Sequence, residues 1–507
     1  MKIWPFSSRR ARPAAPQGAQ QIPGSIRSFD AAMFERTLSN WRWDGGFTNT
    51  EILSALPVIR SRSRDMAKNS PLYARYIQLM RENVVGDGFR FKALPAVSVE
   101  DPTSIDTGAA RLLEYHWWKW GMNPSAVDAG RRQNLTQLLQ LAVENWVRDG
   151  EAFIILDDTA QNRYGLNLRV VRADCIDETV NFDMGDGFAV RGGIEFDIAT
   201  GSPRAYWFNG SRADNGGVVY FHSKPIVRIE ARRVIHLFER HEADQMRGVP
   251  LGYAALVPLK MLDEYTRAEA CTVGVFKSPF DNMNPTKYEV SDKEKSKAEN
   301  MVREGQNLWL PPGYEYSSHT PNHPNRGWAD YSTNLQRLVA TGLGVDFTEL
   351  TGNASAAISV SVRQSILRTR EMYKTRQRVV ASLVLDRLYH AWLRSFLSLA
   401  VSGDLTLEDF ERLSDHEFKG RRWGWVDPSA EVNAATIAVA HGWRTDAEVA
   451  SDYGNDIDDN IKEAARLRPE KEAAGLVTLP SGQQLPEPQP TKGNESNANA
   501  SEPEAQE

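Results

Sequence analysis

The sequence predicts an α+β protein in which helices dominate and a block of strands occupies the middle of the chain. Apolar residues recur at helical spacing over residues 50–85, 109–120 and 134–149, and again from about Ser359 to Val401. Between residues 151 and 238 the pattern changes to short apolar runs broken by Gly, Asp and Asn, which is typical of strands and turns. At 507 residues with 41% hydrophobic content, the chain can form a sizeable core and more than one structural region.

Local signals place the boundaries of several elements. Asn69-Ser70-Pro71 predicts a helix cap followed by a second helix, and VVGDGFRF (84–91) predicts a turn into a strand. Helix returns from Leu251 to Phe276. Beyond it, residues 288–303 carry alternating charges and suit an exposed helix, and residues 307–325 read as strand, turn and loop.

Charge and cysteine content exclude several classes of protein. The net charge is −6, whereas a protein that grips DNA through many phosphates carries a basic surplus. The only cysteines, Cys175 and Cys271, are far apart, so we expect free thiols and neither a disulfide framework nor a CxxC metal site. The first residues lack the apolar run of a signal peptide, and no stretch approaches the roughly 20 apolar residues of a membrane span. We therefore expect no membrane partner.

The stretch LVATGLGVDFTELTGN (338–353) contains glycines of the kind found in nucleotide-binding loops. A dinucleotide fingerprint needs a third glycine and a preceding strand, but Gly342 and Gly344 follow a helical pattern and no third glycine occurs at the required position. A P-loop needs a Gly-Lys pair, and the chain has none. These glycines therefore predict the end of a helix.

Metal motifs are also incomplete. His241-Glu242 begins like HExxH, but Gln245 stands where the second histidine is required, so we expect a surface charge cluster. His319 and His323 are four residues apart in a segment that prolines keep from being helical. We predict no metal site.

No catalytic constellation is visible either. NDIDDN (455–460) lacks the glycine and the distal glutamate of a calcium loop, and we interpret it as a solvated turn before a short helix. There is no GxSxG elbow, and neither cysteine has a catalytic setting. We expect no catalytic residues and no cofactor.

Tryptophans beside basic residues raise the question of base stacking. Trp117, Trp118 and Trp120 flank Lys119, and Trp423 and Trp425 follow two arginines. Because Trp117 and Trp120 are spaced i, i+3, they share one helix face and favour core packing or a subunit contact.

The long helix after Ser359 carries two stripes. The basic one consists of Arg363, Arg370, Lys374 and Arg378. The apolar one, on a neighbouring face, consists of Ile366, Tyr373, Val380, Val384 and Leu388. The basic stripe is either a solvated face or a contact with an acidic surface of an adjacent subunit.

Taken together, these segments resemble the portal proteins of lambda-like tailed bacteriophages over roughly residues 50–460. The resemblance is carried by the arginine-rich run at 59–91, the helix ending in Asp-Gly-Glu at 134–156, the Gly-Ile-Glu-x-Asp strand and Ala-Tyr-Trp partner at 192–208, the Arg-Gly-Val-Pro step at 234–250, the glycine stretch at 338–353 with the serine-rich segment at 354–370, and the Trp-x-Asp-Pro segment at 423–456. The chain departs from many relatives at Asn353, where they carry Asp.

The resemblance implies a structural ring, usually dodecameric, at one vertex of a capsid. Double-stranded DNA is packaged and ejected through its channel. The implied protein partners are the terminase large subunit, the major capsid and scaffold proteins, and the head-completion or adaptor proteins. The implied location is the virion, after assembly in the host cytoplasm.

The family architecture maps onto the chain by region. We expect a disordered basic arm at 1–25, a wing at 26–243, a stem helix at 244–276, a clip at 277–330, a returning stem helix at 331–343, a tunnel loop at 344–360, a long wing helix at 361–400, a crown at 401–468 and a disordered acidic tail at 469–507. Within the tunnel loop, we expect Asn353, Ser355, Ala356 and Ser359 to line the channel.

Two alternatives stay open. A ring protein of a gene transfer agent or of a domesticated prophage would have the same sequence features. A DNA-processing enzyme would instead show metal-dependent cleavage or ATP turnover by the protein alone.

Overall fold

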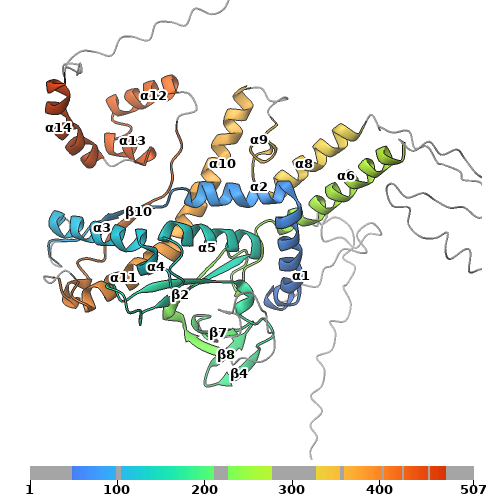
Figure 1. Ribbon diagram of the computed structural model, residues 1–507, viewed down its shortest axis with the longest axis horizontal. Coiled ribbons are helices and arrows are strands. Elements are labelled where there is room, and N and C mark those ends of the chain that lie inside the picture. The colour runs from blue at the N-terminus through green and yellow to red at the C-terminus, as the bar shows by residue number, and fades with distance from the viewer. Residues whose placement is uncertain are drawn as a thin grey trace, which may run out of the picture. The chain divides into compact units, whose positions relative to one another are not determined.

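The computed structural model describes residues 48–98, 104–209, 226–276, 327–353, 359–401, 405–424, 428–454 and 457–474 (Figure 1). The chain divides into two compact units, and every described residue belongs to the second, Thr48–Glu507. The expected arm at 1–25, helix at 288–303 and strand and loop at 307–325 lie outside the described residues. The structure is a mixture of helix and sheet and is 57% helical. The predicted mixed class, in which helices dominate, is therefore confirmed.

The first helices form a capped pair. Helix α1 spans Thr48–Asn69, and Ser70 then caps α2 (Pro71–Met80) by accepting a hydrogen bond from the Tyr73 N–H. Helix α2 continues as a π-helical segment, Arg81–Val85, before strand β1 (Arg90–Ala93). The predicted restart after Ser70 and the turn into a strand are both confirmed.

Three further helices precede the sheets. They are α3 (Thr107–Met122), α4 (Pro124–Val127) and α5 (Leu135–Asp149). Helix α5 begins at a capping box, in which Asn134 and Gln137 satisfy each other's backbone N–H groups. Helices α3 and α5 confirm the two predicted helical stretches.

The middle of the chain forms antiparallel sheets. In the three-stranded sheet, β2 (Glu151–Asp157) lies between β3 (Asn167–Val171) and β9 (Val234–Phe238), and α5 packs against β2 (Figure 1). The five-stranded sheet runs in sequence order through β4 (Phe182–Gly185), β5 (Phe188–Arg191), β6 (Ile194–Asp197), β7 (Pro203–Asn209) and β8 (Ile226–Glu230). This is the strand block that the sequence predicts.

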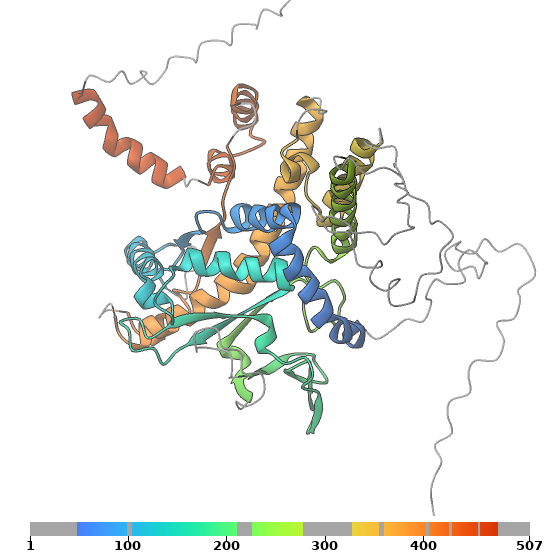
Figure 2. The same cartoon turned by 45° about the vertical axis from the view of Figure 1, so that its right-hand side comes forward.

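Helices α6 (Leu256–Phe276) and α8 (Trp328–Leu343) lie side by side in both views (Figures 1 and 2). The rings of Tyr265 and Tyr331 are 4.9 Å apart between centroids, and Gly342 lies against Ala255. Because a late residue of α8 contacts a residue just before α6, and an early residue of α8 contacts the middle of α6, the two helices run antiparallel.

A short helix, α9 (Phe347–Thr351), follows α8. The long predicted helix then comprises α10 (Ser359–Val380), a π-helical segment (Ala381–Leu385) and α11 (Asp386–Ser398) in unbroken succession. The predicted length is confirmed, whereas the π segment gave no signal in the sequence.

The last described elements are β10 (His416–Lys419), which pairs with β1, and helices α12 (Pro428–Ala440), α13 (Asp446–Asp452) and α14 (Ile457–Ala473). Two sequence predictions need correction here. The acidic segment from Ile457 to Asn460 is part of α14, a helix of 17 residues and not a turn before a short helix. The tail prediction also began too early, because Pro469 lies inside α14, where Glu, Lys and Ala residues sustain a further turn.

The main core gathers helices from both halves of the chain. Trp117 and Trp120 of α3 are buried, and Trp117 meets Trp392 of α11 edge to face at 5.4 Å between centroids. The predicted packing role of this tryptophan pair is confirmed, while Trp118 is exposed and Trp425 lies outside the described residues. Among the described helices, none combines the length and the apolar character needed to cross a bilayer.

Candidate functional site

The segment that leads into α6 crosses the turn between α5 and β2 at backbone contact. Gly150 ends α5 with φ +91°, and a Cβ there would lie 2.4 Å from the carbonyl carbon of Val249. A Cβ on Gly248 would lie 2.1 Å from the Gly150 carbonyl oxygen. Only glycine fits at both positions, and the Leu251 N–H further joins the two segments by donating to the Val147 carbonyl at 3.1 Å.

A buried ion pair holds the same crossing. Arg247 and Glu151 are 1% and 0% exposed, and Arg247 Nε and Nη2 donate to Glu151 Oε1 at 2.9 and 2.6 Å. The Gly248 N–H donates to Glu151 Oε2 at 3.0 Å. One carboxylate of β2 therefore fixes both the side chain and the backbone of the segment before α6.

Arg60 of α1 completes the central network. Its guanidinium donates to Glu151 and to Glu178, and its Nε donates to the Asp149 carbonyl at 3.0 Å. Two arginines thus face two glutamates. Burying charges is costly unless they are paired and hydrogen-bonded, and this arrangement satisfies both conditions.

A second arginine of α1 extends the network outward. Arg64 donates to both carboxylate oxygens of Asp149 at 2.8 and 2.9 Å, and to Asp174 at 2.6 Å. Helix α1 is therefore bound to the end of α5 and to the turn after β3.

The pKa directions match this picture. Burial would raise the pKa of Glu151, but Arg247 and Arg60 outweigh it and hold that pKa well below the usual range. Burial lowers the pKa of His236, so the ring is neutral near pH 7 and its Nε2–H donates to Glu151 Oε2 at 3.0 Å. The carboxylate is fully engaged by fixed partners, and the network is suited to holding elements together.

The glycines of the 338–353 stretch have structural roles at the same end of the helix pair, where α8 ends and α6 begins. A Cβ on Gly342 would lie 3.2 Å from the Cβ of Ala255, so this glycine permits close approach of α8 to the turn before α6. Gly344 ends α8 in the left-handed conformation with φ 70°. The predicted helix end is confirmed.

The expected tunnel loop is not a loop throughout, because residues 347–351 form α9. Asp346 caps this helix by accepting from the Thr348 and Glu349 N–H groups at 2.8 and 3.1 Å, and it also accepts from the Ser365 hydroxyl of α10. Of the four residues predicted to line a channel, Asn353 is exposed after α9 and Ser359 is the first residue of α10. Ser355 and Ala356 lie outside the described residues.

The basic stripe of α10 makes contacts within the chain. Arg370 donates to the Gly424 carbonyl at 3.3 Å and lies over the Trp423 ring, and Lys374 donates to Glu371 at 2.6 Å. Arg378 is exposed, and the side chain of Arg363 lies outside the described residues. The apolar stripe is confirmed as core-facing, with four members buried and Ile366 half-buried. A contact of the basic stripe with another subunit stays a prediction.

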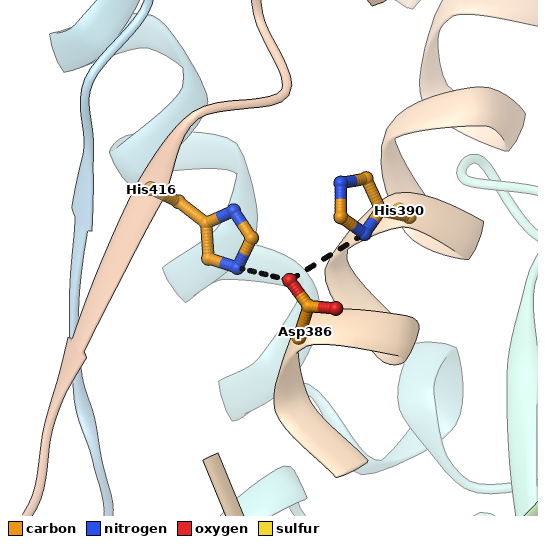
Figure 3. Close-up of side chains that lie close together, drawn as sticks. All are labelled: Asp386, His390 and His416. Carbon is orange, nitrogen blue, oxygen red and sulfur yellow. Dashed lines mark ion pairs between the residues drawn. The ribbon is translucent and has the colours of Figure 1, made fainter. Parts of the chain in front are cut away.

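The incomplete HExxH motif lies at the surface, as expected, and forms a turn. His241 and Glu242 are exposed, and the backbone N–H of His241 donates to Gln245 Oε1 at 2.7 Å. A different cluster was not predicted from the sequence. Asp386, His390 and His416 are the one group in the described part of the chain close enough to share a metal ion (Figure 3). The i, i+4 spacing of Asp386 and His390 was its only sequence signal, because His416 comes from another element.

The buried charges of the network join α1, β2 and the segment before α6, and the central carboxylate of Glu151 is engaged by partners within the chain. Comparison with known proteins names the family. Residues 34–377 match the family model described as phage portal protein, lambda family. The chain therefore belongs to the lambda family of phage portal proteins, a structural and non-enzymatic family.

Individual relatives are distant but align over most of their length. The probable portal protein of Halomonas phage phiHAP-1 is 25% identical over 92% of this chain and 92% of its own. Portal protein B of Escherichia phage lambda is 22% identical over 87% of this chain and 89% of its own. Among solved structures, a chain from the neck of an empty gene transfer agent particle is 15% identical, with a TM-score of 0.37 over 78% of this chain and 93% of its own.

Two of the sequence segments that carry the family resemblance contribute residues to this buried network. Asp149-Gly150-Glu151 and Arg247-Gly248-Val249-Pro250 are far apart in sequence, yet they are in direct contact at the crossing before α6.

Proposed function

We propose that the chain is one subunit of a ring, of twelve copies as is usual in the family, at one vertex of a virion head. Double-stranded DNA would be packaged and ejected through the channel of this ring. The observation that carries the proposal is the family match over residues 34–377. The ring would assemble in the host cytoplasm, and its mature location would be the virion.

In this proposal the α6–α8 pair is the stem. The two helices form an antiparallel out-and-back pair, and the network of Arg247 and Glu151 anchors the chain where it enters α6. Residues 277–330, between the helices, would be the clip, which docks the terminase large subunit and later the head-completion or adaptor proteins. Residues 26–243 and 361–400 would form the wing, and residues 401–468 the crown, with capsid and scaffold proteins as neighbours.

The stem carries apolar side chains that are about half exposed or more in the described part of the chain. Val257 and Met261 of α6 are 62% and 56% exposed, and Tyr331 and Leu338 of α8 are 51% and 55% exposed. Val257 and Met261 share one face of α6, since they are four residues apart. We assign these residues to contacts between the stems of neighbouring copies, because a head-to-tail interface repeated by rotation closes a ring.

The stretch from Asn353 to Ser359 would face the channel, as small and polar residues can lie near DNA without holding it. Asn353 is exposed, which agrees with this assignment.

Sedimentation of the purified protein tests the proposal. We expect a species of about twelve times the 56.9 kDa subunit mass. Leu338→Asp should shift the population toward single subunits, because a carboxylate in an apolar subunit contact loses its hydration. Leu407→Asp is the matched control, since Leu407 is 53% exposed and lies outside the stem. A wild-type species no larger than a dimer, or equal behaviour of the two variants, would contradict the stem interface.

A further inference from the structure

Three potential metal ligands converge between α11 and β10 (Figure 3). Asp386 and His390 are four residues apart on α11 and so lie on one face of the helix. His416 is the first residue of β10. Nε2 of His416 and Nδ1 of His390 lie 3.4 and 3.7 Å from the same carboxylate oxygen, Oδ1 of Asp386.

A second hydrogen bond fixes the orientation of His416. Its Nδ1 lies 2.7 Å from the Ser414 carbonyl oxygen, and a carbonyl only accepts, so Nδ1 carries the proton. In the neutral ring, Nε2 therefore presents a lone pair to Asp386 Oδ1. Histidines that bind metals commonly donate their other ring N–H to a backbone carbonyl in this way.

The distances from the two histidine nitrogens to the carboxylate oxygen are typical of ligands that share a metal ion. They are less typical of groups that hydrogen-bond to one another directly. At 3.4 and 3.7 Å, both nitrogens are beyond the usual length of a hydrogen bond to the carboxylate. With zinc–ligand bonds of about 2.0–2.1 Å, a tetrahedral site places neighbouring ligand atoms about 3.4 Å apart. A cation between the three atoms would also relieve the opposition of the His416 lone pair and the carboxylate.

The surroundings allow an ion to enter from one side. The His416 side chain is 8% exposed and packs against the ring of Tyr389 at 4.4 Å between centroids. The side chains of Asp386 and His390 are 47% and 37% exposed, so water can reach the site and fill a fourth position. Two imidazoles with one carboxylate favour Zn²⁺, whereas Mg²⁺ and Ca²⁺ prefer sites made of oxygen atoms.

We propose that Asp386, His390 and His416 bind a zinc ion that joins β10 to α11. Strand β10 pairs with β1 in the register His416↔Ala93, so the ion would also fasten the β1–β10 ribbon to the long helix. This site is independent of the portal role, and neither outcome of its test bears on ring formation.

Calorimetric titration of the full-length, metal-stripped protein with Zn²⁺ tests the site. We expect about one zinc per chain in a tetrahedral site. Co²⁺ should give the strong visible absorption of a tetrahedral ion. Asp386→Asn and His390→Gln change partly exposed side chains at nearly constant size, and each should weaken zinc binding by more than about tenfold. His241→Gln, at an exposed histidine that is not part of the cluster, should bind zinc like the wild type.

A thermal melt separates loss of the site from loss of the fold. Without metal, the wild type and all three variants should melt alike, and added zinc should raise the melting temperature only of the wild type and His241→Gln. Absence of zinc binding by the wild type would overturn the proposal. Equal binding by Asp386→Asn or His390→Gln would overturn it as well.

Discussion

Arg247 and Glu151 form a wholly buried ion pair in which two guanidinium nitrogens donate to one carboxylate oxygen at 2.9 and 2.6 Å. The pair joins the first residue of β2 to the segment that enters α6. The orientation of the proposed stem relative to the sheets therefore depends on charges that water does not reach.

Arg247→Met should destabilise the protein by about 3–5 kcal/mol, because it leaves Glu151 buried with one charged partner fewer. Arg466→Met is the control, since Arg466 makes an exposed ion pair with Glu463 and the loss of this pair should leave the stability nearly unchanged. Thermal unfolding of both variants checks this. Equal melting temperatures would show that the network contributes nothing to stability.

Stability should fall as the pH is lowered, in two ranges. The folded-state pKa of His236 is lowered by burial, so below about pH 6.5 the unfolded chain binds a proton that the folded chain does not. The pKa of Glu151 is lowered despite its burial, so its contribution is present above about pH 4.3 and is lost as the pH falls below that value.

Denaturant titrations between pH 8 and pH 3 measure both effects. His236→Gln should flatten the stability curve of the first range only, and Glu151→Gln should flatten that of the second. A wild-type stability that rises on acidification would contradict the stated pKa directions.

Gly248→Ala should be more damaging than an ordinary glycine substitution. The added Cβ would meet the Gly150 carbonyl oxygen, and neither backbone can move without disturbing the network, so we expect a cost of about 3 kcal/mol or more. A Cβ at Gly424 meets nothing within 4 Å, so Gly424→Ala should be nearly neutral. Comparison of soluble yield and melting temperature distinguishes the two. If both variants were neutral, the backbone crossing would be looser than described.

Deletion of residues 354–359 should leave ring assembly intact and impair DNA packaging, because this stretch is assigned to the channel and not to the subunit contacts. Sedimentation reports assembly, and nuclease-protected DNA in purified heads reports packaging. A deletion that abolished assembly and nothing else would show that the segment is not a tunnel loop.

Local sequence signals predicted most helices and strands because their causes are local. The cap at Ser70, the helix end at Gly344 and the apolar stripe of the long helix each depend on residues a few positions apart. The prediction failed at Pro469, where the neighbouring residues sustain the helix.

The buried ion network around Glu151 and the cluster of Asp386, His390 and His416 could not be predicted from local sequence signals. Arg60 and Arg247 are charged residues that a sequence reading places at the surface, and only partners far along the chain make their burial possible. His416 likewise meets Asp386 through the pairing of β10 with β1. The family resemblance marked Asp149-Gly150-Glu151 and Arg247-Gly248-Val249-Pro250, but the contact between them is a property of the fold.

Electron microscopy of the purified protein, with subunits counted by rotational symmetry, tests the portal role most directly. We predict closed rings with a central channel wide enough for duplex DNA. Compact dimers enclosing a buried cleft, with no rings, would contradict it.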